Sequence, residues 1–312
     1  MLKDGTLLRI IAPSNRGKTS LMARILNYGQ TQGYHTVRLS LLRAGTNIFS
    51  SEEKFMRWFC ASVTQQLQLE SKLDDYCNED MGSLLNCTLY FQDYLLAEIN
   101  CPLILAIDEI NQLFEYPELA RNFLSLLGSW HQETKDISIW QKLRLIIVHT
   151  TDLNIPLALN KSMFNVGLVI ELKPFTQDEI IDLANRCGLK LLASELEGLM
   201  ELTGGFPYLL RLLFDHCVSH NIAVKKILEN TICETHFYHQ HMHEQFWLLR
   251  EHANLADAFK RVLTADSPIE LEIESALKLK SLGLVHMQGI HATVSCGLYR
   301  DYFQKCCLDL EK

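Results

Sequence analysis

The sequence predicts an α/β fold in which a parallel β-sheet occupies the first half of the chain and a helical region follows it. Short apolar runs alternate with helical spacing over residues 7–172, as expected when helices cover both faces of a parallel sheet. After Pro174 this alternation stops and short helical stretches replace it. The expected strands are Leu7–Ala12, Thr36–Leu41, Leu103–Ile107, Leu143–Val148 and Gly167–Leu172.

The elements between and after these strands follow from the spacing of apolar residues and from helix-breaking residues. In the first half, helices are expected over Ser20–Leu26, 52–69 and 83–98. In the second half we expect short helices over 176–230 with breaks at Gly204, Gly205 and Pro207, then helices and a strand pair, Leu282–Val285 and Ala292–Ser295, around Gly289.

Composition excludes several classes of protein. The 312 residues include 29 basic and 37 acidic side chains, a formal net charge of −8, which argues against a general nucleic-acid binder. No apolar run reaches the roughly 18 residues that span a bilayer, and the start lacks a signal-peptide pattern. The ten cysteines are scattered without a C-x-x-C pair, as in reduced proteins. A cytoplasmic chain without a membrane partner is expected.

A candidate phosphate-binding loop lies between the first strand and the first helix. Gly17 would let backbone N–H groups turn toward phosphate oxygens at the positive end of the helix. Lys18 would reach the β- and γ-phosphates, and the Thr19 hydroxyl would bind Mg²⁺. An ordinary strand-to-helix turn is the alternative. The expected nucleotide-binding residues of the loop are Pro13, Ser14, Asn15, Arg16, Gly17, Lys18, Thr19 and Ser20.

Two carboxylates follow the most apolar strand. Asp108 and Glu109 come directly after Leu103–Ile107, and such a strand would lie beside the phosphate loop in a sheet of this kind. Asp108 would hold Mg²⁺, and Glu109 would orient or deprotonate an attacking water. The alternative is a polar strand end that caps the next helix.

A third polar group follows the Leu143–Val148 strand. Thr150 is the preferred candidate for a side chain that senses the γ-phosphate, and His149 is the second candidate. The alternative is that Thr151 or Asp152 caps a turn.

Several segments together resemble the AAA-like ATPase domain of cyanobacterial and other bacterial multidomain proteins, which is related to the signal-transduction ATPases with numerous domains. In that family the loop usually opens Ala-Pro-Arg, so Ala12 in place of the first glycine is consistent with the resemblance. The similarity covers about residues 7–305. The segments are Ile10–Pro13, Gly17–Leu26, Ala106–Glu109, Ser129–His131, Phe164–Gly167, Leu172–Phe175, Gly204–Leu210 and Leu298–Phe303.

The resemblance implies a P-loop NTPase sheet with strand order 5-1-4-3-2, a helical lid and a C-terminal winged helix. The corresponding boundaries are 1–174, 175–235 and 236–312. It also implies that Pro207 packs on adenine, whereas the residues alone allow a plain helix-start proline. Arg211, one turn further on, is a candidate to reach a phosphate, and a solvated arginine is the alternative. Arg121 is a weaker candidate to act across a subunit interface. Family members usually carry a segment before the first strand that covers adenine, and only six residues precede Leu7 here.

Two further patterns have a functional and a structural interpretation. His236, His239 and His243 would share one face of a helix and could bind Zn²⁺, but a packed helix is favoured because no further ligand is evident. Residues 242–312 carry eight basic and ten acidic side chains, and the expected recognition helix Ile269–Ser281 begins with Glu270, Glu272 and Glu274. Nucleic acid is therefore a possible partner that is not favoured.

Three classes of function remain open at this point. The favoured one is an ATPase with ATP or ADP and Mg²⁺ as cofactors and low turnover, which acts as a nucleotide-dependent signalling or assembly switch through a protein partner or self-assembly. In it Glu109 activates water, Lys18 stabilises charge and Thr150 senses the γ-phosphate. The alternatives are a DNA-associated ATPase regulator and a non-hydrolysing nucleotide-bound scaffold.

Overall fold

The computed structural model describes residues 3–150, 166–229 and 236–306. These residues form two compact units. The sheet unit comprises residues 1–11 and 18–171, and the helical unit comprises residues 12–17 and 172–312. The candidate phosphate loop up to Gly17 therefore groups with the helical unit, whereas Lys18 begins the sheet unit.

The sheet unit contains five parallel strands in the order β2-β3-β4-β1-β5. Read from the other edge, this is the order 5-1-4-3-2 expected of a P-loop NTPase, so the predicted fold class is confirmed. Each observed strand overlaps a predicted one. The strands are β1 (Leu7–Ile11), β2 (His35–Ser40), β3 (Leu103–Asp108), β4 (Leu143–His149) and β5 (Leu168–Glu171).

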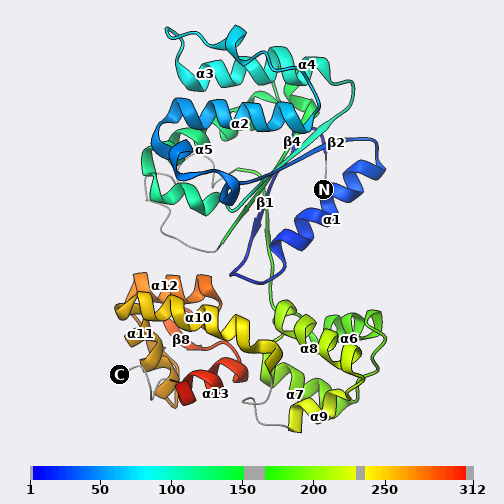
Figure 1. Cartoon of the computed structure of the whole chain (residues 1–312), viewed down its shortest axis with the longest axis vertical. Coiled ribbons are helices and arrows are strands. Elements are labelled where there is room, and N and C mark those ends of the chain that lie inside the picture. The colour runs from blue at the N-terminus through cyan, green and yellow to red at the C-terminus, as the bar shows by residue number, and fades with distance from the viewer. Residues whose placement is uncertain (1–2, 151–165, 230–235, 307–312) are drawn as a thin grey trace. The chain divides into compact units, whose positions relative to one another are not determined.

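Helices cover both faces of this sheet (Figure 1), which explains why β3 is apolar throughout. Leu103, Leu105 and Ile107 belong to the large aromatic core under α2, α3 and α5. Ile104 faces the opposite side, where it meets Gly29 of α1. The α-helices are α1 (Lys18–Thr31), α2 (Glu52–Gln66), α3 (Gly82–Leu89), α4 (Leu96–Glu98) and α5 (Pro117–Glu133).

The predicted helix over 83–98 contains a wider turn. A π-helical segment, Tyr90–Leu95, separates α3 from α4. Tyr90, Phe91, Tyr94 and Leu95 are buried on the core side of this segment, Gln92 is half-buried and accepts from Trp140, and Asp93 is exposed.

The first part of the helical unit contains four helices around one core. Thr176 starts α6 with a reciprocal capping box, in which its backbone N–H donates to Glu179 and its hydroxyl accepts from the Glu179 backbone. Gly204 ends α7 in the left-handed conformation, and Pro207 is the first residue of α8, as the predicted breaks require. These helices are α6 (Gln177–Arg186), α7 (Ala193–Thr203), α8 (Pro207–His220) and α9 (Val224–Glu229).

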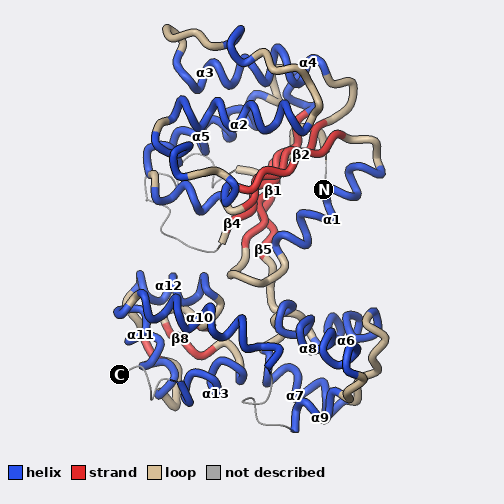
Figure 2. Tube along the Cα trace, viewed as in Figure 1, coloured by secondary structure: helices blue, strands red, loops and turns tan. Residues whose placement is uncertain are grey.

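The second part combines four helices with a small antiparallel sheet of order β6-β8-β7 (Figure 2). The predicted strand pair is present, but its first strand is Val285–Gln288 rather than Leu282–Val285 because α12 continues to Leu282. The predicted recognition helix begins late, at Ile273, because Ile269 and Glu270 pair with β8. The elements are α10 (His239–Glu251), α11 (Ala253–Thr264), β6 (Ile269–Glu270), α12 (Ile273–Leu282), β7 (Val285–Gln288), β8 (His291–Val294) and α13 (Gly297–Cys306).

Candidate functional site

The candidate phosphate loop joins β1 to α1 through two residues with left-handed backbone. Asn15 has φ 59° and Gly17 has φ 88°. Ala12 has no positive φ, so alanine fits the position where such loops usually carry glycine. No described atom lies within 4 Å of the point where a Cβ would stand on Gly17. The left-handed conformation, rather than a close neighbour, is therefore what favours glycine at this position.

Lys18 and Thr19 form the first positions of α1, where unpaired N–H groups and the helix dipole favour an anion. Lys18 is buried, and Ser20, the third helical residue, is exposed. Thr19 donates its hydroxyl to Oδ2 of Asp108 at 3.3 Å. The structure therefore brings together the two residues predicted to hold Mg²⁺.

Asp108 is the last residue of β3, and its carboxylate is only 4% exposed. Besides Thr19, its Oδ2 accepts from Nη2 of Arg38 at 3.1 Å. Arg38 lies on the neighbouring strand β2 and supplies the positive charge that this buried carboxylate needs.

Glu109 has left-handed backbone, with φ 58° and ψ 43°. Such a conformation costs about 1–3 kcal/mol in a residue with a side chain and is concentrated at functional sites. The Glu109 N–H donates to Oδ1 of Asp108 at 3.1 Å, which holds the turn. The backbone that carries the two carboxylates is therefore held in one conformation at the carboxyl end of the sheet.

His149 is the last residue of β4, Thr150 follows it, and both are buried. Nδ1 of His149 donates to the Thr150 carbonyl at 2.7 Å. Burial, together with the positive charges of Arg9 and Lys18, lowers the pKa of His149 to about 4, although the hydrogen bond to Thr150 opposes the shift. The ring is therefore neutral at physiological pH and lies within electrostatic reach of the phosphate-loop lysine. Thr151 and Asp152 are outside the described residues.

The first half of the loop packs against the helical unit. The Ser14 N–H donates to the carbonyl of Ser281 at 2.8 Å. Asn15 lies 3.5 Å from Nδ1 of His241, whose Nε2 is 2.8 Å from the hydroxyl of Tyr299. Since the Asn15 amide donates to Nδ1, the proton of this imidazole resides on Nε2 and points to Tyr299.

Arg16 is the most unusual member of the loop. Its guanidinium carbon lies 3.1 Å from the centre of the Phe206 ring, and only 5% of the residue is exposed. Burial lowers its pKa to about 10, although Tyr299 and Cys296 oppose the shift. Nε and Nη1 have no hydrogen-bond acceptor among the described residues. Buried N–H groups of a cation normally have an acceptor, so this arrangement fits an anionic ligand.

The residue set fits a magnesium nucleotide. Lys18, the first residue of α1 in the sheet unit, suits phosphate oxygens. Within the helical unit, Nε and Nη1 of Arg16, for which the described residues supply no acceptor, suit an anion. The Thr19 hydroxyl and the Asp108 carboxylate are oxygen ligands of the kind that Mg²⁺ prefers, and they already contact each other. Pro13 is half-buried at the start of the loop.

The other predicted residues have structural contacts of their own. Pro207 opens α8 directly after Phe206. Arg211 is exposed and pairs with Asp215 on the same helix at 2.8 Å, and Arg121 is exposed on α5. His243 accepts from Trp247, and in the described ranges no three His, Cys, Asp or Glu residues gather to hold a metal ion. The adenine and Arg211 assignments remain predictions.

Five residues near the loop or the carboxylates were not predicted from the sequence. Arg38 is one of several charged strand residues, and nothing in the pattern pairs it with Asp108. Phe206 is adjacent to the predicted Pro207, so the motif indicates its neighbourhood but not its contact with Arg16. The others, Ser281, His241 and Tyr299, are separated from the loop by more than two hundred residues.

A family model described as an AAA-like domain matches residues 1–305. The chain belongs to this family. The AAA-like domain is a P-loop ATPase domain, which agrees with the sheet order, the loop and the paired carboxylates. No curated protein sequence matches the chain.

Solved structures support the fold of this AAA-like domain. The Walker-type ATPase PABY2304 of Pyrococcus abyssi aligns with a TM-score of 0.65 at 15% identity, over 96% of this chain and 91% of that one. The Aeropyrum pernix ORC2 protein, in its ADPNP–ADP complexes, aligns with a TM-score of 0.56 at 14% identity, over 98% and 88%. Among the described residues, no helix of the AAA-like domain is long and apolar enough to span a bilayer.

Proposed function

We propose that this AAA-like domain binds Mg-ATP, hydrolyses it slowly and uses the nucleotide state to switch the contacts of its C-terminal region. ATP and ADP with Mg²⁺ are the proposed cofactors, and a protein partner or a second copy of the chain is the proposed receiver of the signal. The proposed domains are the ATPase core 1–174, a lid 175–235 and a winged-helix-like domain 236–312.

The chemistry is assigned to residues that the sheet unit holds in place. Mg²⁺, held by Thr19 and Asp108, would supply charge neutralisation on the phosphates. Lys18 stabilises charge that develops on the transferred group, and Glu109 accepts a proton from the attacking water. Thr150, buried at the end of β4, senses the γ-phosphate, with neutral His149 beside it.

The proposed switch is supported by one observation: loop residues 12–17 belong to the helical unit. Ser14, Asn15 and Arg16 each contact a side chain or carbonyl of residues 206–299. An incoming phosphate would offer the buried N–H groups of Arg16 the acceptor they lack. Because the same residue stacks on Phe206, phosphate binding and the packing of the helical unit depend on one side chain. A ligand that interacts differently with two arrangements shifts the balance between them.

DNA binding is not the favoured function of the C-terminal region. Glu272 precedes α12 and Glu274 lies in its first turn, and both are exposed, where a helix that enters a DNA groove needs positive charge. We therefore assign this region to protein contacts.

The test measures nucleotide binding, turnover and the response of the helical unit in the full chain. Binding is followed by titration with a fluorescent ATP analogue, and turnover by phosphate release. Wild type is compared with Lys18→Ala and Glu109→Gln. We expect Lys18→Ala to lose ATP binding, and Glu109→Gln to bind ATP while turnover falls by about 100-fold or more.

The switch has its own readout, hydrogen exchange over residues 236–306 with ATP, with ADP and without nucleotide. Glu109→Gln serves as the trapped ATP state. Different exchange in ATP and ADP supports the switch. Equal exchange in all three states, with normal turnover, would leave the ATPase standing and refute the switch. A wild type that binds no nucleotide would refute both.

A further inference from the structure

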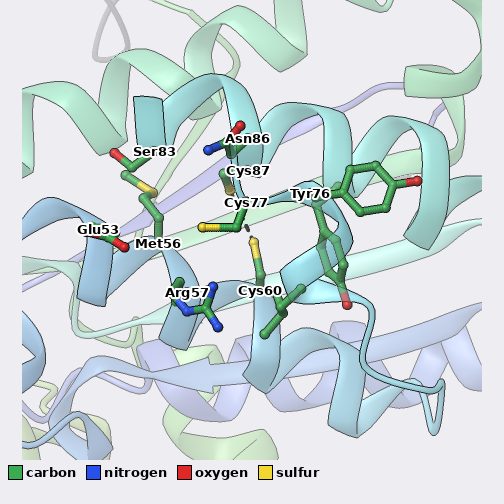
Figure 3. Close-up of a pocket in the computed structure, with 11 residues that line it drawn as sticks. Glu53, Met56, Arg57, Cys60, Tyr76, Cys77, Ser83, Asn86 and Cys87 are labelled. Atoms are coloured by element: carbon green, nitrogen blue, oxygen red, sulfur yellow. Dashed lines mark hydrogen bonds between the residues drawn. The ribbon is translucent and has the colours of Figure 1, made fainter. Parts of the chain in front are cut away.

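The sheet unit contains a small cavity lined by three cysteines. Its lining residues are distant in sequence from the phosphate loop. It lies between α2 and α3 and has a volume of about 40 Å³ (Figure 3). That volume holds about three water molecules, so a molecule as small as a peroxide enters it. Cys60, Cys77 and Cys87 line it together with Arg57, and in Figure 3 the three thiols point into the same space.

Two of these thiols are already in contact. The sulfur atoms of Cys60 on α2 and Cys87 on α3 are 3.4 Å apart, and both residues are buried. A disulfide requires the two sulfurs to approach by roughly a further 1.4 Å. Packing of the two helices therefore preassembles a pair that the spacing of the cysteines in the sequence does not reveal.

The third thiol has a different environment. Cys77 is exposed and follows a short helical turn that ends at Tyr76. The guanidinium of Arg57 pairs with Asp74 at 2.7 Å, and Arg57 lines the same cavity as Cys77. Burial raises the pKa of Cys87 well above its ordinary value, so this thiol reacts slowly with a peroxide from solution, whereas its attack on the Cys60 sulfur is assisted by their separation of only 3.4 Å. Cys77 is thus the accessible member of the cluster.

We propose that this cluster is a peroxide-oxidised modification site, in which Cys77 reacts first and the oxidation ends as a Cys60–Cys87 disulfide. The exposed Cys77 reacts with the peroxide, and the two buried cysteines form the final disulfide. Among the described residues no three His, Cys, Asp or Glu groups surround a metal position, so thiol oxidation rather than metal binding fits the cluster.

The steps balance with one peroxide as the oxidant. The Cys77 thiolate attacks a peroxide oxygen, the O–O bond breaks, and the leaving hydroxide takes a proton and departs as water. Cys60 attacks the resulting sulfenic sulfur, its thiol proton leaves with the displaced hydroxide as a second water, and a Cys60–Cys77 disulfide forms. Cys87 then attacks the Cys60 sulfur, and its proton goes to the released Cys77. Two thiols are oxidised and one peroxide is reduced to two waters.

The product would change the sheet unit measurably. A Cys60–Cys87 bond closes a loop of 26 intervening residues and joins α2 to α3. Restricting the unfolded chain in this way raises the melting temperature by roughly 5–10 °C. The effect is reversed by dithiothreitol.

The experiment exposes the reduced full chain to hydrogen peroxide, blocks remaining thiols with N-ethylmaleimide and maps disulfides by peptide mass spectrometry. Wild type is compared with Cys77→Ser and with Cys101→Ser, a partly buried free cysteine outside the cavity. We expect a Cys60–Cys87 peptide in wild type and Cys101→Ser, formed about tenfold more slowly in Cys77→Ser.

Two results would overturn the proposal. In one, Cys77 is oxidised to sulfinic acid while Cys60 and Cys87 remain alkylated. In the other, the Cys60–Cys87 disulfide forms at the same rate with and without Cys77. Neither result depends on a variant of the buried pair, so a failure of such a variant to fold does not affect the test. ATP binding plays no part in it, and the proposed ATPase stands or fails separately.

Discussion

At the scale of single residues, Asp108 shows how a site is assembled around one buried carboxylate. Its two oxygens accept from the hydroxyl of Thr19, the guanidinium of Arg38 and the backbone of Glu109. These donors come from α1, β2 and the turn after β3, so three elements converge on one acidic group. Removal of any one partner leaves a buried charge less well compensated.

His149 provides a pH prediction at the same scale. Its pKa is about 4 in the folded chain and 6.5 in the unfolded chain. Between pH 6.5 and pH 4, therefore, His149 is protonated in the unfolded chain and neutral in the folded chain. Stability is therefore highest above pH 6.5 and is lost on acidification. We expect the His149 contribution to the free energy of unfolding to fall by about 2 kcal/mol between pH 6.5 and pH 5.

The comparison is with His149→Asn, which can still donate to the Thr150 carbonyl but does not titrate. Urea unfolding at a series of pH values gives both curves, and their difference cancels the other histidines. Parallel curves for wild type and variant would show that the imidazole is not buried in its neutral form.

At the scale of elements, the packing of α1 on β3 depends on a glycine within the helix. A Cβ on Gly29 would lie 2.2 Å from Cδ1 of Ile104, a contact that cannot exist without movement. Glycine in a helix is normally unfavourable by about 1 kcal/mol, and here it permits the close approach of helix and strand. The helix that carries Lys18 and Thr19 thereby lies close against the sheet.

Gly29→Ala is expected to lower the free energy of unfolding by about 1–2 kcal/mol, because overpacking outweighs the gain in helix propensity. Ile104→Val removes the clashing methyl and alone costs about 1 kcal/mol. In the double variant the alanine should become neutral or stabilising. Urea unfolding of the four proteins measures this coupling, and strictly additive effects would contradict the contact.

At the scale of the whole molecule, the loop connects two units with separate hydrophobic cores. Within the helical unit, the contact of Arg16 with Phe206 holds the first half of the loop on the core, and a buried guanidinium over a ring is worth about 1–2 kcal/mol. Phe206→Leu keeps an apolar side chain and removes the ring. We expect it to reduce the ATP-dependent change in hydrogen exchange over residues 236–306 while ATP still binds through Lys18.

Phe246→Leu is the matched control, because Phe246 packs on the same core without contacting the loop. The exchange experiment is run on both variants with ATP and with ADP. If Phe206→Leu responds to nucleotide as strongly as Phe246→Leu, the Arg16–Phe206 contact does not transmit the nucleotide state.

The sequence predicts the parallel sheet because apolar strands, loop glycine and strand-end carboxylates are local patterns, whereas the strand order came from the family resemblance. Lys18, Thr19, Asp108 and Glu109 follow from spacing alone, and Thr19 and Asp108 are found in contact. The π-helical turn at Tyr90–Leu95 is not predicted, because its apolar spacing also suits an ordinary α-helix. The late start of α12 is not predicted, because Ile269 and Glu270 pair with β8.

The contacts of the loop with Phe206, His241 and Ser281 could not be predicted from the chain. They join residues that are distant in sequence, and their side chains are also common in ordinary cores. The same holds for Cys60 and Cys87, whose proximity results from the packing of two helices. Local sequence patterns predict strands, helices and motifs, whereas these side-chain contacts depend on the tertiary structure.

The stacking of Arg16 on Phe206 also has an evolutionary consequence. A change at either position leaves the other with a buried group that has lost its partner, so a single substitution is disfavoured unless the second follows. Among homologous chains, positions 16 and 206 should therefore vary together, and lineages that replace the arginine should also replace the aromatic ring.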